Sequence, residues 1–244
     1  MPHHGADPED AGRPPLSRLL FSESSVEHRE AERRPFQVAF LKAELPRDAY
    51  AAYLGQLALI YERLEAIDDA LADDATVGAM HSPELHRSAA IDADMRYFAG
   101  DDWRSQVDAM PATFAYLDRL EWARAQMPVA YVAHQWLRYL GNVLAAPVMQ
   151  RVMRAAYDLD SDDGMRFYVF EQIPDARAYL TAYHERLNGL PLGGVAARAL
   201  VAEGKYAFGL QIRLVDELGA RFGIGPIDPD EAERVLRGLS EDHP

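Results

Sequence analysis

Helical periodicity runs along almost the whole of this 244-residue chain and constrains its fold more than any other feature. Apolar residues recur every three to four positions, which is the spacing of one face of an α-helix. The pattern covers 16–33, 36–43, 46–72, 82–100, 112–125, 128–158, 174–189 and 194–222, and Asp228-Pro229 begins a short last helix. Such a chain is expected to be all-α, with its helices packed around a shared core.

The predicted organisation is a single domain. Residues 1–14 are polar and rich in Pro, Gly and Asp, which predicts a disordered tail. Residues 15–224 are expected to form the helical domain, and 225–244 a short C-terminal helix and tail. Met165–Phe170 has the composition of a strand, but a lone strand would leave its backbone groups without partners. We therefore expect an extended loop or a short helical turn there.

Charge and cysteine content narrow the function classes. The chain has 39 Asp and Glu against 25 Lys and Arg, a net charge of −14, which argues against nucleic acid and anionic membranes as partners. Cysteine is absent, which excludes disulfides, thiolate catalysis and cysteine-bound iron–sulfur clusters. Neither a transmembrane run nor a signal-peptide pattern is present, so a cytoplasmic protein is expected.

The segment Val132–Met149 (VAHQWLRYLGNVLAAPVM) places a glycine and a proline inside a helical pattern. These residues cost roughly 1 and 3 kcal/mol against alanine in a helix interior. A cost of this kind marks a bend or a close approach of the backbone. A bent helix beside an apolar cavity suits a large flat ligand. An early helix carries His28 with Glu32 four residues later, which predicts a ligand held between these two helices.

Several segments in a fixed order carry a resemblance to a known family. They are VEHREAE (26–32), LIYERLE (59–65), PELHRSAAIDADMRYFAGDDW (83–103), VAHQWLRYLGN (132–142), MRFYVF (165–170), YHERLNGL (183–190) and KYAFGLQIRLVDEL (205–218). Through them the chain, over roughly Leu16 to Phe222, resembles heme oxygenases of the eukaryotic and actinobacterial type. The resemblance implies a single-domain heme oxygenase-like helical bundle.

The resemblance also implies the reaction. Heme would serve as substrate and cofactor, and dioxygen with electrons from an external reductant would open it to biliverdin, ferrous iron and carbon monoxide. The chain has no G-x-G-x-x-G motif after a strand, so it offers no nicotinamide or flavin site of its own. The expected partners are therefore heme and an electron donor of the ferredoxin or reductase type.

Residue roles follow from the family positions. His28 matches the proximal iron ligand, and Glu32 could accept a hydrogen bond from its other ring nitrogen. The distal positions that deliver protons to bound dioxygen are Tyr61, Tyr116, Arg138, Asn142 and Gln211. Positions expected to contact heme are Trp136, Gly141, Ala145, Ala146, His184 and Phe208. The remaining histidines are read otherwise: His86 as structural and His134 as a hydrogen-bonded core residue.

The chain departs from the family at the distal helix. Asn142 stands where many members have an aspartate, and an amide cannot ionise. Ala145 and Ala146 replace two glycines, which brings methyl groups toward the ligand.

At the positions that supply cations to the heme carboxylates, the chain has Phe21, Leu180 and His184. These departures keep open an alternative, a heme-binding or heme-sensing protein with little turnover. A weaker alternative is a non-heme dimetal oxidase, but the later helices lack a D-x-x-x-H or E-x-x-H pattern.

Overall fold

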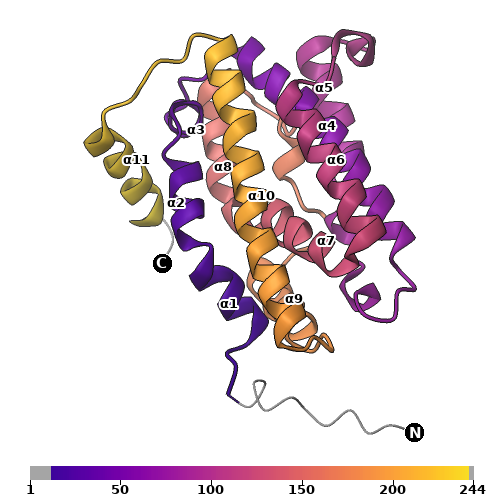
Figure 1. Cartoon of the computed structure of the whole chain (residues 1–244). Coiled ribbons are helices and arrows are strands. Elements are labelled where there is room, and N and C mark those ends of the chain that lie inside the picture. The colour runs from indigo at the N-terminus through magenta and orange to yellow at the C-terminus, as the bar shows by residue number, and fades with distance from the viewer. Residues whose placement is uncertain (1–11, 242–244) are drawn as a thin grey trace, which may run out of the picture.

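The computed structural model describes residues 12–241, and this part of the chain is a bundle of helices without a β-strand (Figure 1). The α-helices are α1 (Leu16–Glu23), α2 (Ser25–Glu32), α3 (Pro35–Leu41), α4 (Arg47–Ala70), α5 (Ser88–Ala99), α6 (Pro111–Gln126), α7 (Pro128–Gln135), α8 (Gly141–Tyr157), α9 (Ala176–Asn188), α10 (Gly194–Arg221) and α11 (Pro229–Glu241). Short 3₁₀ helices are η2 (Gly78–Met80), η3 (Pro83–Leu85), η4 (Trp103–Gln106) and η6 (Arg166–Tyr168), and a π-helical turn is η5 (Trp136–Leu140). The predicted all-α fold is confirmed.

Helix α10 runs through the middle of the bundle and contacts α1, α2, α3, α4, α6 and α7 (Figure 1). Its buried residues Leu210, Leu214 and Leu218 recur at helical spacing, so one face of the helix is apolar along its length. Gly204 lets α1 approach closely, because a Cβ at this position would lie 3.1 Å from the Cδ2 atom of Leu20. The core is therefore built around α10, and α2 and α3 lie on one side of it.

The prediction of one continuous helix over 16–33 is wrong, because the chain forms two helices that meet at Ser24. The backbone of Ser24 has φ −98° and ψ 8°, outside the helical range, and its Oγ donates to the carbonyl oxygen of Leu20 at 2.5 Å. A serine that bonds to the preceding turn in this way competes with the helical pattern and bends the chain. Helix α2, which carries His28, thus has its own direction.

The predicted helix 82–100 is also divided, into the 3₁₀ turn η3 and helix α5. The carboxylate of Glu65, on α4, accepts hydrogen bonds from the backbone N–H groups of Arg87 and Ser88, where α5 begins. The start of α5 is thus satisfied by a side chain from another helix, which no local pattern in the sequence could indicate.

The predicted segment 128–158 is helical throughout, as α7, η5 and α8. Its direction changes between α7 and α8, where the π turn Trp136–Leu140 lies (Figure 1). π turns are a recognised cause of kinks and often occur at functional sites. Pro147 lies farther on, inside α8. The irregularity thus falls directly before Gly141 and not at the proline.

The strand-like segment Met165–Phe170 contains the 3₁₀ turn η6, so the prediction of a loop or short helical turn is confirmed. Buried Asp94 holds this turn by accepting hydrogen bonds from the backbone N–H groups of Arg166 at 2.9 Å and Phe167 at 2.8 Å. Burial raises the pKa of Asp94 to about 6, although these hydrogen bonds act in the other direction.

Both ends of the described chain have identifiable contacts. Of the tail predicted over 1–14, residues 1–11 lie outside the described residues, and Arg13 donates to the carbonyl oxygen of Leu192 at 2.7 Å. At the other end Asp228 accepts from the N–H groups of Asp230 and Glu231, which begins α11 as predicted.

No helix in the described range 12–241 has the length and apolar character needed to cross a membrane.

Candidate ligand cavity

A cavity of about 810 Å³ lies between α2 and α3 on one side and α8 on the other. Cavities that hold small molecules and cofactors span about 300–1,000 Å³. Apolar side chains make up much of its wall, including Leu41, Leu57, Val143, Val148, Met149 and Phe167. A second hollow of about 490 Å³, between 43–47 and 155–158, is more open, and none of the residues predicted for the site borders it.

The backbone of α8 faces open space at Gly141. A Cβ atom added there would meet no heavy atom within 4 Å, and Gly141 is part of the cavity wall. Ala145, one turn later, also borders the cavity, whereas Ala146 is buried at 8% exposure and does not. Of the two alanines predicted to contact the ligand, the structure therefore places only Ala145 at the wall.

His28 borders the same cavity from α2. Its side chain is 49% exposed, and its ring centroid lies 5.3 Å from that of Phe208. Glu32 Oε1 lies 3.6 Å from Nε2 of His28, beyond hydrogen-bond distance. A half-turn of the imidazole about its terminal torsion exchanges Nδ1 with Cδ2 and Nε2 with Cε1, so it redirects the ring nitrogens without exchanging them. Nε2, which faces Glu32 here, must therefore turn away from Glu32 if it is to bind a ligand.

Tyr61 and Asn142 form a compact polar group beside Gly141. The hydroxyl of Tyr61 donates to the carbonyl oxygen of Arg138 at 2.7 Å. Asn142 Nδ2 donates to the same carbonyl at 2.8 Å and to the Tyr61 hydroxyl at 3.1 Å. Because both partners accept, the amide orientation is fixed and Oδ1 is left as the free acceptor of Asn142.

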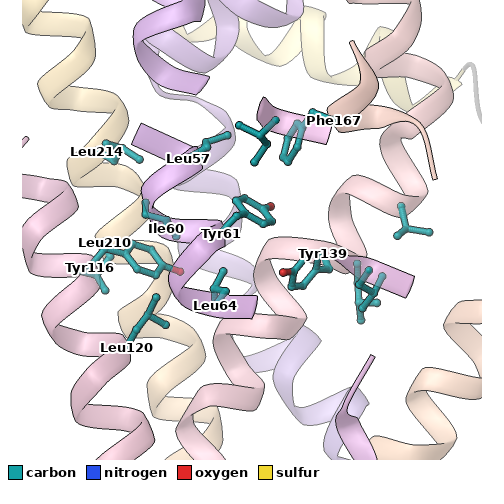
Figure 2. Close-up of a cluster of buried hydrophobic side chains, with 14 of the residues drawn as sticks. Leu57, Ile60, Tyr61, Leu64, Tyr116, Leu120, Tyr139, Phe167, Leu210 and Leu214 are labelled. Carbon is teal, nitrogen blue, oxygen red and sulfur yellow. The ribbon is translucent and has the colours of Figure 1, made fainter. Parts of the chain in front are cut away.

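The ring of Tyr61 packs edge-on against Phe167 and Tyr139, with ring centroids 5.3 and 5.2 Å away (Figure 2). Burial raises the pKa of Tyr61 far above its ordinary value, although the charge of Arg138 opposes the shift. The hydroxyl therefore stays protonated and acts as a donor at neutral pH.

Arg138 is the buried cation of the site. Its Nε donates to the Tyr116 hydroxyl at 3.1 Å, and Nη1 donates to Gln211 Oε1 at 2.6 Å. Gln211 Nε2 in turn donates to the hydroxyl of Tyr53 at 3.4 Å. The second terminal nitrogen of Arg138, Nη2, is buried and has no hydrogen-bond partner within residues 12–241. Because Arg138 borders the cavity, this nitrogen is a donor that a ligand or water could satisfy.

A second set of hydrogen bonds continues from Tyr116 away from the cavity. Nδ1 of buried His134 lies 3.1 Å from the Tyr116 hydroxyl, and its Nε2 lies 2.8 Å from Glu203 Oε1. Glu203 also forms a two-pronged ion pair with Arg119. The carboxylate can only accept, so Nε2 of His134 carries the proton and Nδ1 accepts from Tyr116. Burial lowers the pKa of His134, so the ring is neutral at pH 7. As predicted, His134 is a core hydrogen-bonding residue.

The positions expected to face ligand carboxylates carry little positive charge. Phe21 is 68% exposed and Leu180 is buried at 8% exposure. His184 lies on α9 beside Tyr183, with ring centroids 6.3 Å apart, and burial lowers its pKa. Arg186 donates to Ser82 Oγ at 2.9 Å, so it is engaged away from the cavity. Arg177, at the start of α9, borders the cavity.

The structure brings most of the predicted site residues to one cavity. Those that border it are His28, Glu32, Tyr61, Arg138, Gly141, Asn142, Ala145, Phe208 and Gln211. The others lie behind or beside it: Tyr116 behind Arg138, Trp136 with its ring centroid 6.4 Å from that of Phe208, and Ala146 and His184 away from the wall. Within the described part of the chain no three His, Asp or Glu side chains form a group that could hold a metal ion, which a dimetal site would need.

Sequence reasoning did not find Glu203 or Leu236. Glu203 had a signal, because a carboxylate at helical spacing from Leu200 and Ala207 marks a buried charge. Leu236 borders the cavity from α11, beyond the segments that carried the resemblance, and nothing in its local sequence points to it.

Comparisons with known proteins agree with this geometry. The family model described as heme oxygenase matches residues 15–217. Heme oxygenase 1 of Synechocystis is 30% identical over 203 residues, 83% of this chain and 84% of that protein. Mouse heme oxygenase 2 is 32% identical over 205 residues, 83% of this chain and 65% of that protein.

Solved structures agree as well. The crystal structure of Synechocystis heme oxygenase-1 in complex with heme matches with a TM-score of 0.81 and 28% identity, covering 86% of this chain and 97% of that one. Heme oxygenase from Leptospira interrogans matches with a TM-score of 0.81 and 27% identity, covering 84% of this chain and 100% of that one.

Proposed function

This chain belongs to the heme oxygenase family, and from that premise we propose that it holds heme between α2 and α8 and opens the ring to biliverdin, ferrous iron and carbon monoxide. The electron donor would be a separate protein of the ferredoxin or reductase type, because the sequence carries no motif for a nicotinamide or flavin site. A cytoplasmic location, expected from the sequence, is part of the same proposal.

The observation that carries this proposal is the open space at Gly141 opposite His28. A side chain at position 141 would project into the cavity, and its absence leaves room for a flat ring against the backbone of α8. Imidazole is a suitable axial ligand for heme iron, and His28 borders the cavity from α2. The apolar wall, with Val143 and Phe208, would bury the porphyrin faces.

When bound, heme supplies the iron at which dioxygen is activated. The chain supplies the polar and apolar side chains that surround the ligand. The protonated hydroxyl of Tyr61 donates to the carbonyl oxygen of Arg138 and holds Asn142 in place, and Oδ1 of Asn142 can accept a hydrogen bond from a water molecule in the cavity. Arg138 offers its Nη2 hydrogens, and Gln211 and Tyr116 hold its guanidinium in place. Apolar side chains around these groups exclude bulk water, which strengthens the hydrogen bonds inside.

Purified protein titrated with hemin and then given a reductant would test this function. A Soret band on titration followed by growth of a biliverdin absorption band is the expected result. If hemin produced no Soret band, heme binding and the proposed reaction would both be refuted.

A second candidate is a heme-binding or heme-sensing protein with little turnover. It is favoured by the geometry of Asn142, whose amide donors are both directed to protein acceptors and whose side chain cannot ionise. Under the same conditions this candidate predicts a Soret band that persists after the reductant is added, without a biliverdin band.

A further inference from the structure

Helix α11 follows the residues that match the family model, which end at 217, and lies beside α2 and α3 (Figure 1). Its Leu236 is part of the cavity wall. We propose that α11 forms a retaining wall of the heme cavity and that Leu236 is a binding residue for the porphyrin. This inference rests on the proposed function, since it assigns the ligand of that cavity.

One face of α11 is directed toward the body of the protein. Ala232 is 1% exposed, and Leu236 lies one helical turn later on the same face. Arg234 and Arg237 are exposed. A helix of 13 residues is only marginally stable by itself, so its place depends on what it contacts. The apolar face therefore fixes α11 against the cavity side of the bundle.

Ion pairs join α11 to the ends of α2 and α3. Lys42, the C-cap residue of α3, places Nζ 2.6 Å from Glu231 Oε1, and this hydrogen bond is the largest cause of the raised pKa of Lys42. Arg33, the C-cap residue of α2, pairs with Glu233. These four side chains are between 26% and 45% exposed, so the pairs are weakened by salt.

The two ion pairs also bear on how the ligand is held. Arg33 and Lys42 follow the wall residues Glu32 and Leu41 in the chain, and both cations are paired with carboxylates of α11. Phe21 and Leu180 offer no cation to the heme carboxylates, which leaves retention of heme to apolar enclosure and to Arg177 at the cavity wall. A wall contributed by α11 supplies such enclosure.

Hemin release from the full-length protein to excess apomyoglobin, followed at the Soret band, tests this inference. Leu236→Ala should release hemin roughly three- to tenfold faster, because part of a leucine side chain no longer covers the ring. The double variant Glu231→Gln, Glu233→Gln should also release hemin faster. Salt should speed release from the unmodified protein and have less effect on this double variant, since the screened pairs are absent.

Arg234→Gln is the matched control, because it removes one charge from the same helix on the face away from Leu236. It should release hemin at the unmodified rate. Circular dichroism and thermal melts establish that all variants fold. Equal release rates for Leu236→Ala, the double variant and the control, with hemin still bound, would overturn the wall and leave heme binding intact. A protein that bound no hemin would instead refute the proposed function, and the inference with it.

Discussion

His28 and Asn142 border the cavity from different helices, and the immediate neighbours of each define its chemistry. Glu32 Oε1 lies 3.6 Å from Nε2 of His28, just beyond hydrogen-bond distance, so Glu32 can orient the imidazole only after a small movement of its side chain. Asn142 is held by two hydrogen bonds to protein oxygens, which leaves it only an acceptor toward the cavity. The first residue would determine whether heme is ligated, and the second how readily a proton arrives.

Replacing His28 with alanine should remove the histidine-ligated heme spectrum and abolish turnover, because no other imidazole borders the described cavity. Absorbance of the hemin complex, with added imidazole as a rescue ligand, is the measurement. His81→Ala serves as the control, since His81 pairs with Asp69 outside the cavity. An unchanged spectrum and activity in His28→Ala would assign ligation to another residue.

Replacing Asn142 with aspartate should increase the yield of biliverdin in a single turnover. The new carboxylate can hold and release a proton beside Tyr61, and positioned acid–base groups contribute about 10²–10⁴-fold in general. Yields measured side by side for the two proteins decide the question. An equal or lower yield from the aspartate variant would show that proton delivery is not limited at this position.

At the scale of elements, the turn η6 depends on a carboxylate from α5. Asp94 accepts from two successive backbone N–H groups of the turn, and this holds Phe167 at the cavity wall and against Tyr61. Burial raises the pKa of Asp94 to about 6, from an ordinary value of 3.8. The carboxylate therefore binds a proton more readily in the folded than in the unfolded chain.

Asp94→Asn should destabilise the protein by about 1–3 kcal/mol, because the amide cannot accept both N–H groups as the carboxylate does. It should also weaken hemin binding through displacement of Phe167. Since the folded-state pKa is raised, ionisation of Asp94 opposes folding above pH 6, and this penalty disappears as the pH falls toward 4. The stability difference between the two proteins should therefore grow from pH 7.5 to pH 4.5.

Urea unfolding at both pH values measures the effect of Asp94→Asn. Asp101→Asn, whose side chain is 91% exposed, is the control. If Asp94→Asn matched the control at every pH, the role assigned to the hydrogen bonds of Asp94 would be wrong.

At the scale of the whole molecule, a buried hydrogen-bonded chain joins α6, α7 and α10 through Tyr116, His134 and Glu203. Burial lowers the pKa of His134, so the folded protein holds it neutral, whereas the unfolded chain takes up a proton near pH 6.5. Burial opposes ionisation of Glu203, but hydrogen bonds from Arg119 and His134 hold its pKa below the ordinary value. Both groups therefore stabilise the fold less as the pH falls, His134 below about 6.5 and Glu203 below about 4.5.

His134→Gln should lose less stability than the unmodified protein between pH 7.5 and 5.5, because glutamine does not titrate. Comparing the two proteins isolates this group from His86, whose pKa is raised by its hydrogen bond to Asp68 even though burial lowers it. The free energy of unfolding from urea titrations at the two pH values is the measurement. Parallel changes in both proteins would mean that His134 is protonated in the folded state.

Much of the fold and of the candidate site could be predicted from the sequence. Helical periodicity reports which face of each segment is buried, so the helices and the all-α class followed directly. The motifs, taken in their order along the chain, also indicated site residues such as Tyr61, Arg138 and Gly141, which line one cavity in the structure. The helices and these site residues could be predicted from the sequence because a helix is specified by residues three or four positions apart and a site residue by the motif around it.

Only the tertiary structure decided how the helices end and which of their residues meet. The start of α5 is held by Glu65, 22 positions before Arg87, and η6 is held by Asp94. Leu236 borders the cavity from α11, a helix joined by ion pairs to Arg33 and Lys42 from a distant part of the chain. Periodicity reveals that a face is buried but not what buries it, because the partner of a side chain is fixed by three-dimensional packing and not by the sequence around it.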